Sequence, residues 1–218
     1  CAVIIEPIQG ESGILPATQE YLQAARRLCD EHGALLILDE VQTGMGHTGK
    51  LFAYEHYGIT PDILSSAKAL GGGFPIGAIL TTDKIAPTFG PGTHGSTFGG
   101  NPMACAVGSR AFDIINTPET LAHVEKQGQK LQTALRELGE KTGAFKEVRG
   151  MGLLIGCVLA DKYQGRASEI TAAALKHGLM VLVAGADVVR LAPSLLLNDE
   201  DMAEGLKRLE AALKEWAD

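Results

Sequence analysis

The sequence predicts an α/β fold, with a mainly parallel sheet in its first half and a smaller α+β domain after it. Strand-like apolar runs alternate with an amphipathic helical stretch up to about residue 80, the usual pattern of a parallel sheet with crossover helices. Past residue 116 the pattern changes to long amphipathic helices and short strands bounded by glycines. We therefore expect two domains, residues 1–116 and 117–218.

The first half contains the expected parallel strands. A short β-branched run occupies residues 2–5. Thr18 has the character of a helix N-cap, apolar residues follow at helical spacing, and Gly33 would end the helix. Residues 34–40, "ALLILDE", form a continuous apolar run that ends in two acids and predicts a strand buried on both faces. Further strands are expected around residues 63 and 76–80.

Residues 87–102 are rich in Gly, Pro, Ser and Thr and are expected to form a long loop, a kind of segment that often carries function. A helix should begin near Asn101. The apolar spacing then predicts a helix at 117–141, two strands around Gly150 and Gly152, a helix at 168–177, strands at 179–183 and 188–192, and a last amphipathic helix at 199–216.

Composition limits the classes of function. The 218 residues carry a net charge of −7 with scattered Lys and Arg, which argues against nucleic acid or an anionic membrane as partner. No apolar run approaches the ~20 residues of a membrane span. The four cysteines show neither a C-x-x-C pair nor metal-ligand spacing, so we expect reduced thiols in a cytoplasmic protein and no metal site. The chain begins inside a strand-like run without methionine, which indicates a fragment lacking its first half.

Two residues follow the ends of expected strands, where ligands bind in parallel sheets. Asp39 ends the run "LILD", and a carboxylate there needs a partner such as a protonated pyridine nitrogen. Lys68 follows a second strand and precedes three glycines. A partly desolvated lysine has a lowered pKa and forms a Schiff base with an aldehyde.

Two further features bind anions. The stretch "HGSTFGGNP" offers hydroxyls and backbone amides to a phosphate. Arg190 suits a substrate carboxylate, and Glu11 is expected to face the same cleft. An aldehyde, a pyridinium and a phosphate together describe pyridoxal 5′-phosphate.

The segments "EPIQGESG", "LILDEVQTGMGHTGKLFAYEHYGITPDI", "SSAKALGGGFPIGA", "HGSTFGGNPMACA" and "VRGMGLLIGCVL" resemble the class III, ornithine-type, pyridoxal-phosphate-dependent aminotransferases of fold type I. The resemblance covers essentially the whole chain and is nearest the bacterial acetylornithine and succinylornithine branch. It implies that residues 1–116 are the C-terminal part of the large cofactor-binding domain and that 117–218 are the small domain.

The resemblance also implies roles for the cofactor-binding residues. Lys68 would bind the cofactor covalently and then move the substrate proton, and Asp39 would keep the pyridine nitrogen protonated. Gln42 would bond the ring hydroxyl and Val41 would pack on the ring. The hydroxyl pair Ser96 and Thr97 would reach the phosphate of the neighbouring subunit's cofactor, making a homodimer with shared active sites.

In the same family pattern, Arg190 would bind the α-carboxylate of glutamate, and Glu11 would pair with Arg190 when the other substrate enters by its terminal amine. The implied reaction moves the terminal amine of N-acetylornithine to 2-oxoglutarate, giving N-acetylglutamate semialdehyde and glutamate in arginine biosynthesis. Succinyldiaminopimelate is a further substrate to consider. The alternative donors are succinylornithine, ornithine and 4-aminobutyrate.

Structural alternatives stand beside these roles. Ser96 and Thr97 would serve equally to stabilise their loop, Arg190 to form a strand-edge ion pair, and Glu11 to be a surface acid. We expect structural roles for His47, which replaces the family's usual arginine, and for His94. The family's phosphate-binding turn and helix, ring-stacking aromatic residue and substrate arginine are absent from this sequence. The chain is therefore either part of an active enzyme or a noncatalytic fragment.

Overall fold

The computed structural model describes residues 1–217 and shows two compact units, each assembled from separate parts of the chain. The first unit contains residues 1–7, 17–46 and 50–118; the second contains residues 8–16, 47–49 and the chain from Glu119 onward. The last change of unit lies close to the boundary expected near residue 116, but two short earlier segments pack with the second unit. The assignment of these parts to domains of a larger enzyme stays a prediction.

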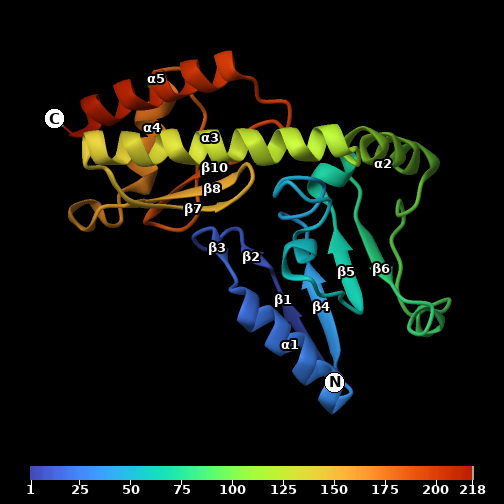
Figure 1. The fold of residues 1–218 in the computed structure, drawn as a ribbon. Coiled ribbons are helices and arrows are strands. Elements are labelled where there is room, and N and C mark those ends of the chain that lie inside the picture. The colour runs from blue at the N-terminus through green and yellow to red at the C-terminus, as the bar shows by residue number, and fades with distance from the viewer. Residues whose placement is uncertain (218) are drawn as a thin grey trace. The chain divides into compact units, whose positions relative to one another are not determined.

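A four-stranded sheet organises the first unit, in the order β1-β4-β5-β6 (Figure 1). Its strands are β1 (Ala2–Ile5), β4 (Leu35–Asp39), β5 (Ile63–Ser66) and β6 (Ala78–Thr81). The first three are parallel, and β6 pairs antiparallel with β5. The prediction of a mainly parallel sheet is confirmed. The parallel register sets Asp39 opposite Ser65, so β4 and β5 end at the same edge.

Helix α1 (Gln19–His32) follows the predicted boundaries because both of its ends are capped. The side chain of Thr18 accepts a 3.2 Å hydrogen bond from the Tyr21 amide, and Gly33 adopts the left-handed conformation at φ 63°. Leu22 and Cys29 are buried against the rest of the unit.

Strand β4 differs from expectation in its burial. Leu36 and Leu38 are fully buried, whereas Leu35, Ile37 and Asp39 are only half-buried. Successive side chains of a strand point to opposite faces, so one face of β4 is sealed and the other is partly open within this chain. The prediction of burial on both faces was wrong for residues 1–217.

The expected loop contains one short 3₁₀ turn, Ala86–Thr88, and otherwise no helix or strand until α2 (Pro102–Ile115). Asn101 caps α2, as the sequence predicts, and its side chain accepts a 2.9 Å hydrogen bond from the Ala104 amide. Every residue from 91 to 100 is exposed.

The second unit is an α+β layer, as expected for the end of the chain. Figure 1 shows its three helices on one side of an antiparallel sheet whose order is β7-β8-β10-β9. The strands are β7 (Phe145–Met151), β8 (Leu154–Leu159), β9 (Leu182–Val183) and β10 (Val188–Leu191). The helices are α3 (Pro118–Thr142), α4 (Ala167–Lys176) and α5 (Asp199–Ala217). Fully buried residues from both layers form one core, among them Leu135, Ile155, Ile170 and Leu209.

A two-stranded hairpin, β2 (Ile8–Gln9) with β3 (Leu15–Pro16), belongs to this second unit. Ile14 is fully buried with Leu154 and Val188. A Cβ built at Gly156 would lie 2.9 Å from the Ile14 Cβ, so the glycine is needed for this close approach.

The cysteines are free thiols, as the sequence predicts. Cys29 and Cys157 are buried, and burial raises the pKa of Cys157 to about 12. Since the thiolate is the reactive form, Cys157 is expected to be chemically inert.

Helices α3 and α5 are the longest, at 25 and 19 residues, and both carry many charged side chains. Among residues 1–217, no helix combines the length and the apolar character needed to cross a bilayer.

Candidate active site

Asp39 is the last residue of β4, at the edge of the sheet where ligands bind in parallel folds. Its Oδ1 atom accepts two hydrogen bonds, from the Ser65 hydroxyl at 3.0 Å and from the Val41 amide at 3.0 Å. Both donors contact the same oxygen, and within the described chain Oδ2 is left open to a further N–H group. The two donors therefore orient the carboxylate through Oδ1 and leave Oδ2 able to accept a further hydrogen bond.

Lys68 lies two residues beyond the end of β5, the parallel neighbour of β4. Its backbone has φ 47°, in the left-handed region that costs a residue other than glycine about 1–3 kcal/mol. The 3₁₀ turn Lys68–Gly71 holds this conformation, with the Leu70 amide bonded to the Ala67 carbonyl at 2.9 Å. Such strain is typical of functional positions. The side chain is exposed, so residues 1–217 do not supply the desolvation that the sequence led us to expect.

The glycines after Lys68 have two separate functions. Gly71 is buried, and a Cβ added there would lie 2.8 Å from Cγ2 of Ile76. Gly73 has φ 107°, a conformation that other residues rarely adopt. The tight turn expected beside Lys68 is present, and it folds back onto the segment that leads to β6.

Val41 and Gln42 follow Asp39 and are half-buried. Glu40, the acid between Asp39 and Val41, is unusual for a charged residue because it is only 1% exposed. Its carboxylate accepts hydrogen bonds from the Thr43 hydroxyl, from the Ala53 amide at 2.9 Å and from the Tyr54 amide at 2.8 Å.

Burial raises the pKa of Glu40, although its three hydrogen bonds oppose this shift. Burial, together with the nearby Glu40 carboxylate, also raises the pKa of Tyr57 to about 12. No role for Glu40 was predicted from the sequence. The signal that was available is a second acid directly after a buried strand, where an unpaired carboxylate would be strongly unfavourable.

Ser96 and Thr97 lie in the exposed 91–100 segment. The Ser96 hydroxyl accepts a 3.1 Å hydrogen bond from the Gly99 amide, so it stabilises its own turn. This contact matches the structural alternative for Ser96, and it leaves the hydroxyl proton available as a donor. Nothing in this chain tests the expected phosphate contact.

Glu11 and Arg190, which are far apart in sequence, meet in the second unit. Arg190 Nη1 donates to Glu11 Oε1 at 2.7 Å and more weakly to the Gly10 carbonyl at 3.4 Å. The Arg190 side chain is 13% exposed and that of Glu11 is 67% exposed. Glu11 and Arg190 therefore form a direct ion pair in the structure.

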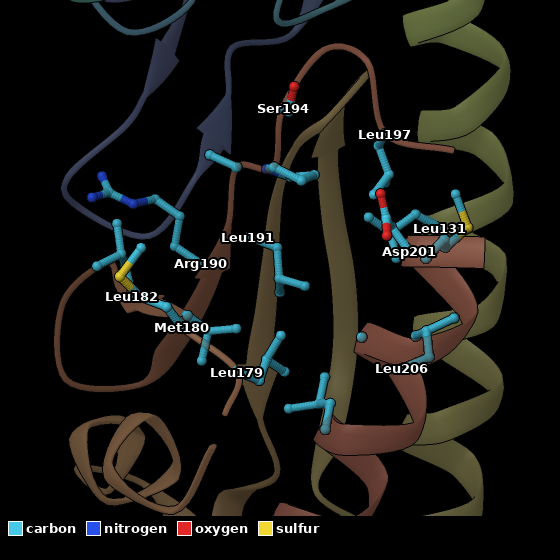
Figure 2. Close-up of a pocket in the computed structure, with 16 residues that line it drawn as sticks. Leu131, Leu179, Met180, Leu182, Arg190, Leu191, Ser194, Leu197, Asp201 and Leu206 are labelled. Carbon is cyan, nitrogen blue, oxygen red and sulfur yellow. The ribbon is translucent and has the colours of Figure 1, made fainter. Parts of the chain in front are cut away.

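Arg190 also lies at the rim of a pocket of about 350 Å³ in the second unit. Figure 2 shows its guanidinium directed away from Leu179, Leu191 and Leu206, which line the interior. The charged group faces Glu11, and the pocket behind it is lined mainly by apolar side chains, with Ser194 and Asp201 among the polar ones.

The two histidines have structural contacts. The His47 carbonyl accepts a 2.9 Å hydrogen bond from the Leu153 amide, inside the second unit. His94 is exposed, lies 3.0 Å from the Thr93 hydroxyl through Nδ1 and meets the Phe89 ring edge-on. The side-chain contacts of His94 match its structural interpretation, whereas the His47 contact is made by the backbone and the role of that side chain stays a prediction.

Comparison with known proteins identifies a family whose sequence pattern this chain matches. A model described as aminotransferase class-III matches residues 1–213. The acetylornithine aminotransferase of Neisseria meningitidis serogroup B is 83% identical over 217 residues, which are 100% of this chain and 54% of that protein. The succinylornithine transaminase/acetylornithine aminotransferase of Pseudomonas aeruginosa is 58% identical over 98% of this chain and 52% of its own length. The chain thus spans about half the length of the curated relatives that it matches.

Solved structures agree with this similarity. The N-acetylornithine aminotransferase of Stenotrophomonas maltophilia superposes with a TM-score of 0.92 at 46% identity, over 100% of this chain and 57% of that one. The ornithine aminotransferase of Plasmodium yoelii gives a TM-score of 0.91 at 33% identity, over 99% of this chain and 57% of that one.

Proposed function

Because the chain belongs to the class III aminotransferases, we propose that it forms the lysine-bearing part of a pyridoxal-phosphate-dependent acetylornithine aminotransferase. The reaction moves the terminal amine of N-acetylornithine to 2-oxoglutarate and yields N-acetylglutamate semialdehyde and glutamate. The observation that carries this proposal is the placement of Asp39 and Lys68 after adjacent parallel strands, one with an open carboxylate oxygen and the other with an exposed amine.

The residues present fit pyridoxal phosphate. Oδ2 of Asp39 is available to a pyridinium N–H, and the Lys68 amine is available to an aldehyde. When bound, the cofactor supplies an electron sink for the carbanion that forms on the substrate. Val41 and Gln42, in the turn after Asp39, are the residues that would contact the face and the hydroxyl of its ring.

Asp39 and Lys68 would hold and move the protons of this reaction. Asp39 Oδ2 would hold the proton on the ring nitrogen, with Ser65 and Val41 fixing the carboxylate in place. Lys68 Nζ would take the proton from the substrate carbon that bears the amine and deliver it to the aldehyde-derived carbon of the cofactor. The strained backbone of Lys68 supports this role because it directs the amine from a fixed point at the sheet edge.

The Glu11–Arg190 pair would let one site accept two unlike substrates. With N-acetylornithine, whose terminal amine carries no neighbouring carboxylate, Glu11 would stay paired and neutralise the guanidinium. With glutamate, the α-carboxylate would replace Glu11 in a bidentate contact with Arg190. The 2.7 Å contact supports the first of these two states.

Ser96 and Thr97 would donate to the cofactor phosphate of a neighbouring copy, so we propose a homodimer as the active form. The exposure of the whole 91–100 segment supports this assignment, since its hydroxyls are open to a partner.

Succinylornithine is the second candidate donor. The Pseudomonas aeruginosa relative carries both activities in its name, which favours a site that accepts either acyl group. A coupled assay with 2-oxoglutarate and each of N-acetylornithine, succinylornithine, ornithine and 4-aminobutyrate ranks the donors by kcat/KM. We expect N-acetylornithine to lead.

The deciding experiment is visible absorption of the purified protein with pyridoxal phosphate. We expect a protein-bound band in the unmodified chain and in the control variant Lys50→Ala, which removes another exposed lysine, and no band in Lys68→Ala. A band that survives Lys68→Ala contradicts the proposal. A folded chain without any band supports the alternative that residues 1–218 alone are noncatalytic.

A further inference from the structure

The backbone of Glu40 anchors both ends of the turn that contains Val41 and Gln42. Its amide donates to the Ser65 carbonyl of β5 at 3.1 Å, which continues the sheet ladder by one residue. Its carbonyl accepts from the Gly44 amide at 2.9 Å. The four residues after Glu40 are therefore anchored to it at their start and at their finish.

The Glu40 side chain ties this turn to a distant segment. Ala53 and Tyr54 begin the 3₁₀ helix Ala53–Tyr57, where backbone amides have no partner inside the helix. Glu40 Oε2 accepts from Ala53 and Oε1 accepts from Tyr54, and the Thr43 hydroxyl completes the set. One carboxylate thus joins the end of β4, the 41–44 turn and the start of this helix.

Stability alone is a poor reason for this arrangement. Taking a carboxylate out of water is expensive, and an apolar side chain of similar volume often serves a core equally well. A carboxylate does what an apolar residue cannot: it fixes three donors in defined directions. The cluster therefore specifies geometry more than it adds stability.

The geometry that it specifies is that of the proposed site. The Val41 amide donates to Asp39 Oδ1, and the peptide that contains this amide begins at Glu40. A shift of Glu40 would move the Val41 N–H, and with it one of the two donors that orient the Asp39 carboxylate. The same shift would turn the side chains of Val41 and Gln42.

We infer that Glu40 is a positioning residue for the cofactor site: through Thr43 and the first amides of the 3₁₀ helix, it sets the orientation of Asp39 and of the Val41–Gln42 turn. The catalytic meaning of this inference rests on the proposed function, whereas the tie between the three segments is a property of the chain itself.

Two variants break the tie to different degrees. Glu40→Gln keeps the volume but replaces one acceptor oxygen with an NH₂ group, so one of the two helix amides loses its acceptor. Thr43→Val removes only the hydroxyl, while Thr43→Ser retains it as the conservative comparison. Glu55→Gln is the matched control, because Glu55 accepts from the Phe52 amide at 2.9 Å on the same short helix and is exposed.

The first readout is amide hydrogen exchange in the protein without pyridoxal phosphate. We expect exchange at residues 41–44 and 53–54 to rise by about tenfold or more in Glu40→Gln and by less in Thr43→Val, as for the loss of one or two hydrogen bonds. Glu55→Gln should leave residues 41–44 unchanged. Unchanged exchange at 41–44 in both Glu40→Gln and Thr43→Val overturns the inference.

The second readout is the cofactor band itself. A misdirected Asp39 holds the ring proton less well, so Glu40→Gln should weaken pyridoxal phosphate binding by about tenfold and shift the pH at which the band changes by about one unit. Thr43→Ser should keep the pyridoxal phosphate affinity and the pH of the band change closer to those of the unmodified protein than Thr43→Val does. If Glu40→Gln does not fold, the Thr43 pair carries the test.

Faster exchange together with unchanged cofactor affinity, unchanged band and unchanged kcat would make Glu40 a structural tie only, and the inference would be wrong. Failure of the unmodified protein to bind pyridoxal phosphate is a different result. It supports the alternative that residues 1–218 alone are noncatalytic, and the positioning role for a cofactor in this chain is overturned with it, whatever the exchange data show.

Discussion

Arg190 and Glu11 form a 2.7 Å ion pair across 179 residues of sequence, and their two sides are unequal. Arg190 is largely buried on β10, where the strand ladder fixes its backbone against β8 and β9. Glu11 is mostly exposed in the β2–β3 hairpin. An exposed carboxylate exchanges a protein partner for water at little cost, whereas a buried guanidinium needs a replacement anion. Arg190 is therefore the fixed member of the pair, and Glu11 is the member that another anion can replace.

Replacing Glu11 with glutamine tests this asymmetry. Under the proposed function, the variant would leave Arg190 without its neutralising charge when N-acetylornithine binds, so kcat/KM for that donor should fall by about tenfold. The glutamate half-reaction should change by less than about threefold, because the substrate carboxylate then replaces Glu11. Single-turnover absorbance of the two half-reactions gives both values. Ser12→Ala, beside Glu11, is the control, and equal losses in both half-reactions would contradict the model.

Asp39 should matter far more than the residue that orients it. Asp39→Asn cannot hold a proton on a ring nitrogen, and we expect kcat to fall by about a hundredfold or more. Ser65→Ala removes one of two donors to Oδ1 and should cost about tenfold or less. Steady-state kinetics with excess pyridoxal phosphate, together with thermal melts, separate these losses from unfolding. The assignment fails if a folded Asp39→Asn variant turns over normally.

Gly71 sets the packing of the turn after Lys68. Gly71→Ala places a methyl group 2.8 Å from Cγ2 of Ile76, too close for any ordinary carbon contact. We expect the free energy of unfolding to fall by about 1–3 kcal/mol. Gly90→Ala has nothing within 4 Å and no positive φ, so it should leave stability nearly unchanged. Urea denaturation compares the two variants, and an equal effect from both would refute the packing argument.

Asp62 joins α1 to β4 and should give the first unit an acid-sensitive contact. Burial alone would raise the pKa of Asp62, but hydrogen bonds from the Leu36 amide at 2.7 Å and from Arg26 at 2.8 Å hold it below its usual value. A depressed pKa stabilises the fold above the ordinary value of 3.8, and this contribution disappears as pH falls through the lower folded pKa.

Asp62→Asn should therefore be less stable than the unmodified protein at pH 7, by about 1–3 kcal/mol, and the gap should close as the pH falls through the lowered pKa of Asp62. Denaturant titrations across that range measure it. The matched control is Asp30→Asn, which removes the other carboxylate bound to Arg26, an exposed one. Its effect at pH 7 should stay within about 0.5 kcal/mol. A gap that persists in acid would assign the effect to packing.

Sequence reasoning succeeded where structure depends on neighbours along the chain. Thr18, Gly33 and Asn101 act as helix caps in the structure because a cap is a contact over three or four residues. The placement of Asp39 and Lys68 after strands was predicted for the same reason: apolar runs and the residues that end them are visible in the sequence.

Prediction from the sequence failed where the burial of a residue depends on distant partners or its backbone conformation depends on a tight turn. The burial of Glu40 is set by amides thirteen and fourteen residues further on, which no local pattern reveals. The left-handed backbone of Lys68 belongs to the 3₁₀ turn Lys68–Gly71, which no apolar periodicity in the sequence reveals. The half-open face of β4 depends on what lies beside the sheet, and an apolar run cannot show that.

The interleaving of the two units limits how this protein can be recombined. The second unit takes residues 8–16 and 47–49 as well as the chain from Glu119 onward, and Ile14 fills the space left by Gly156. A gene crossover at residue 118 would exchange the sheet and helices of that unit but not its hairpin. The new hairpin would then have to match a foreign strand at a position that tolerates no Cβ. We therefore expect chimeras built by a single exchange to be productive only between close relatives, and distant exchanges to need the hairpin transferred as well.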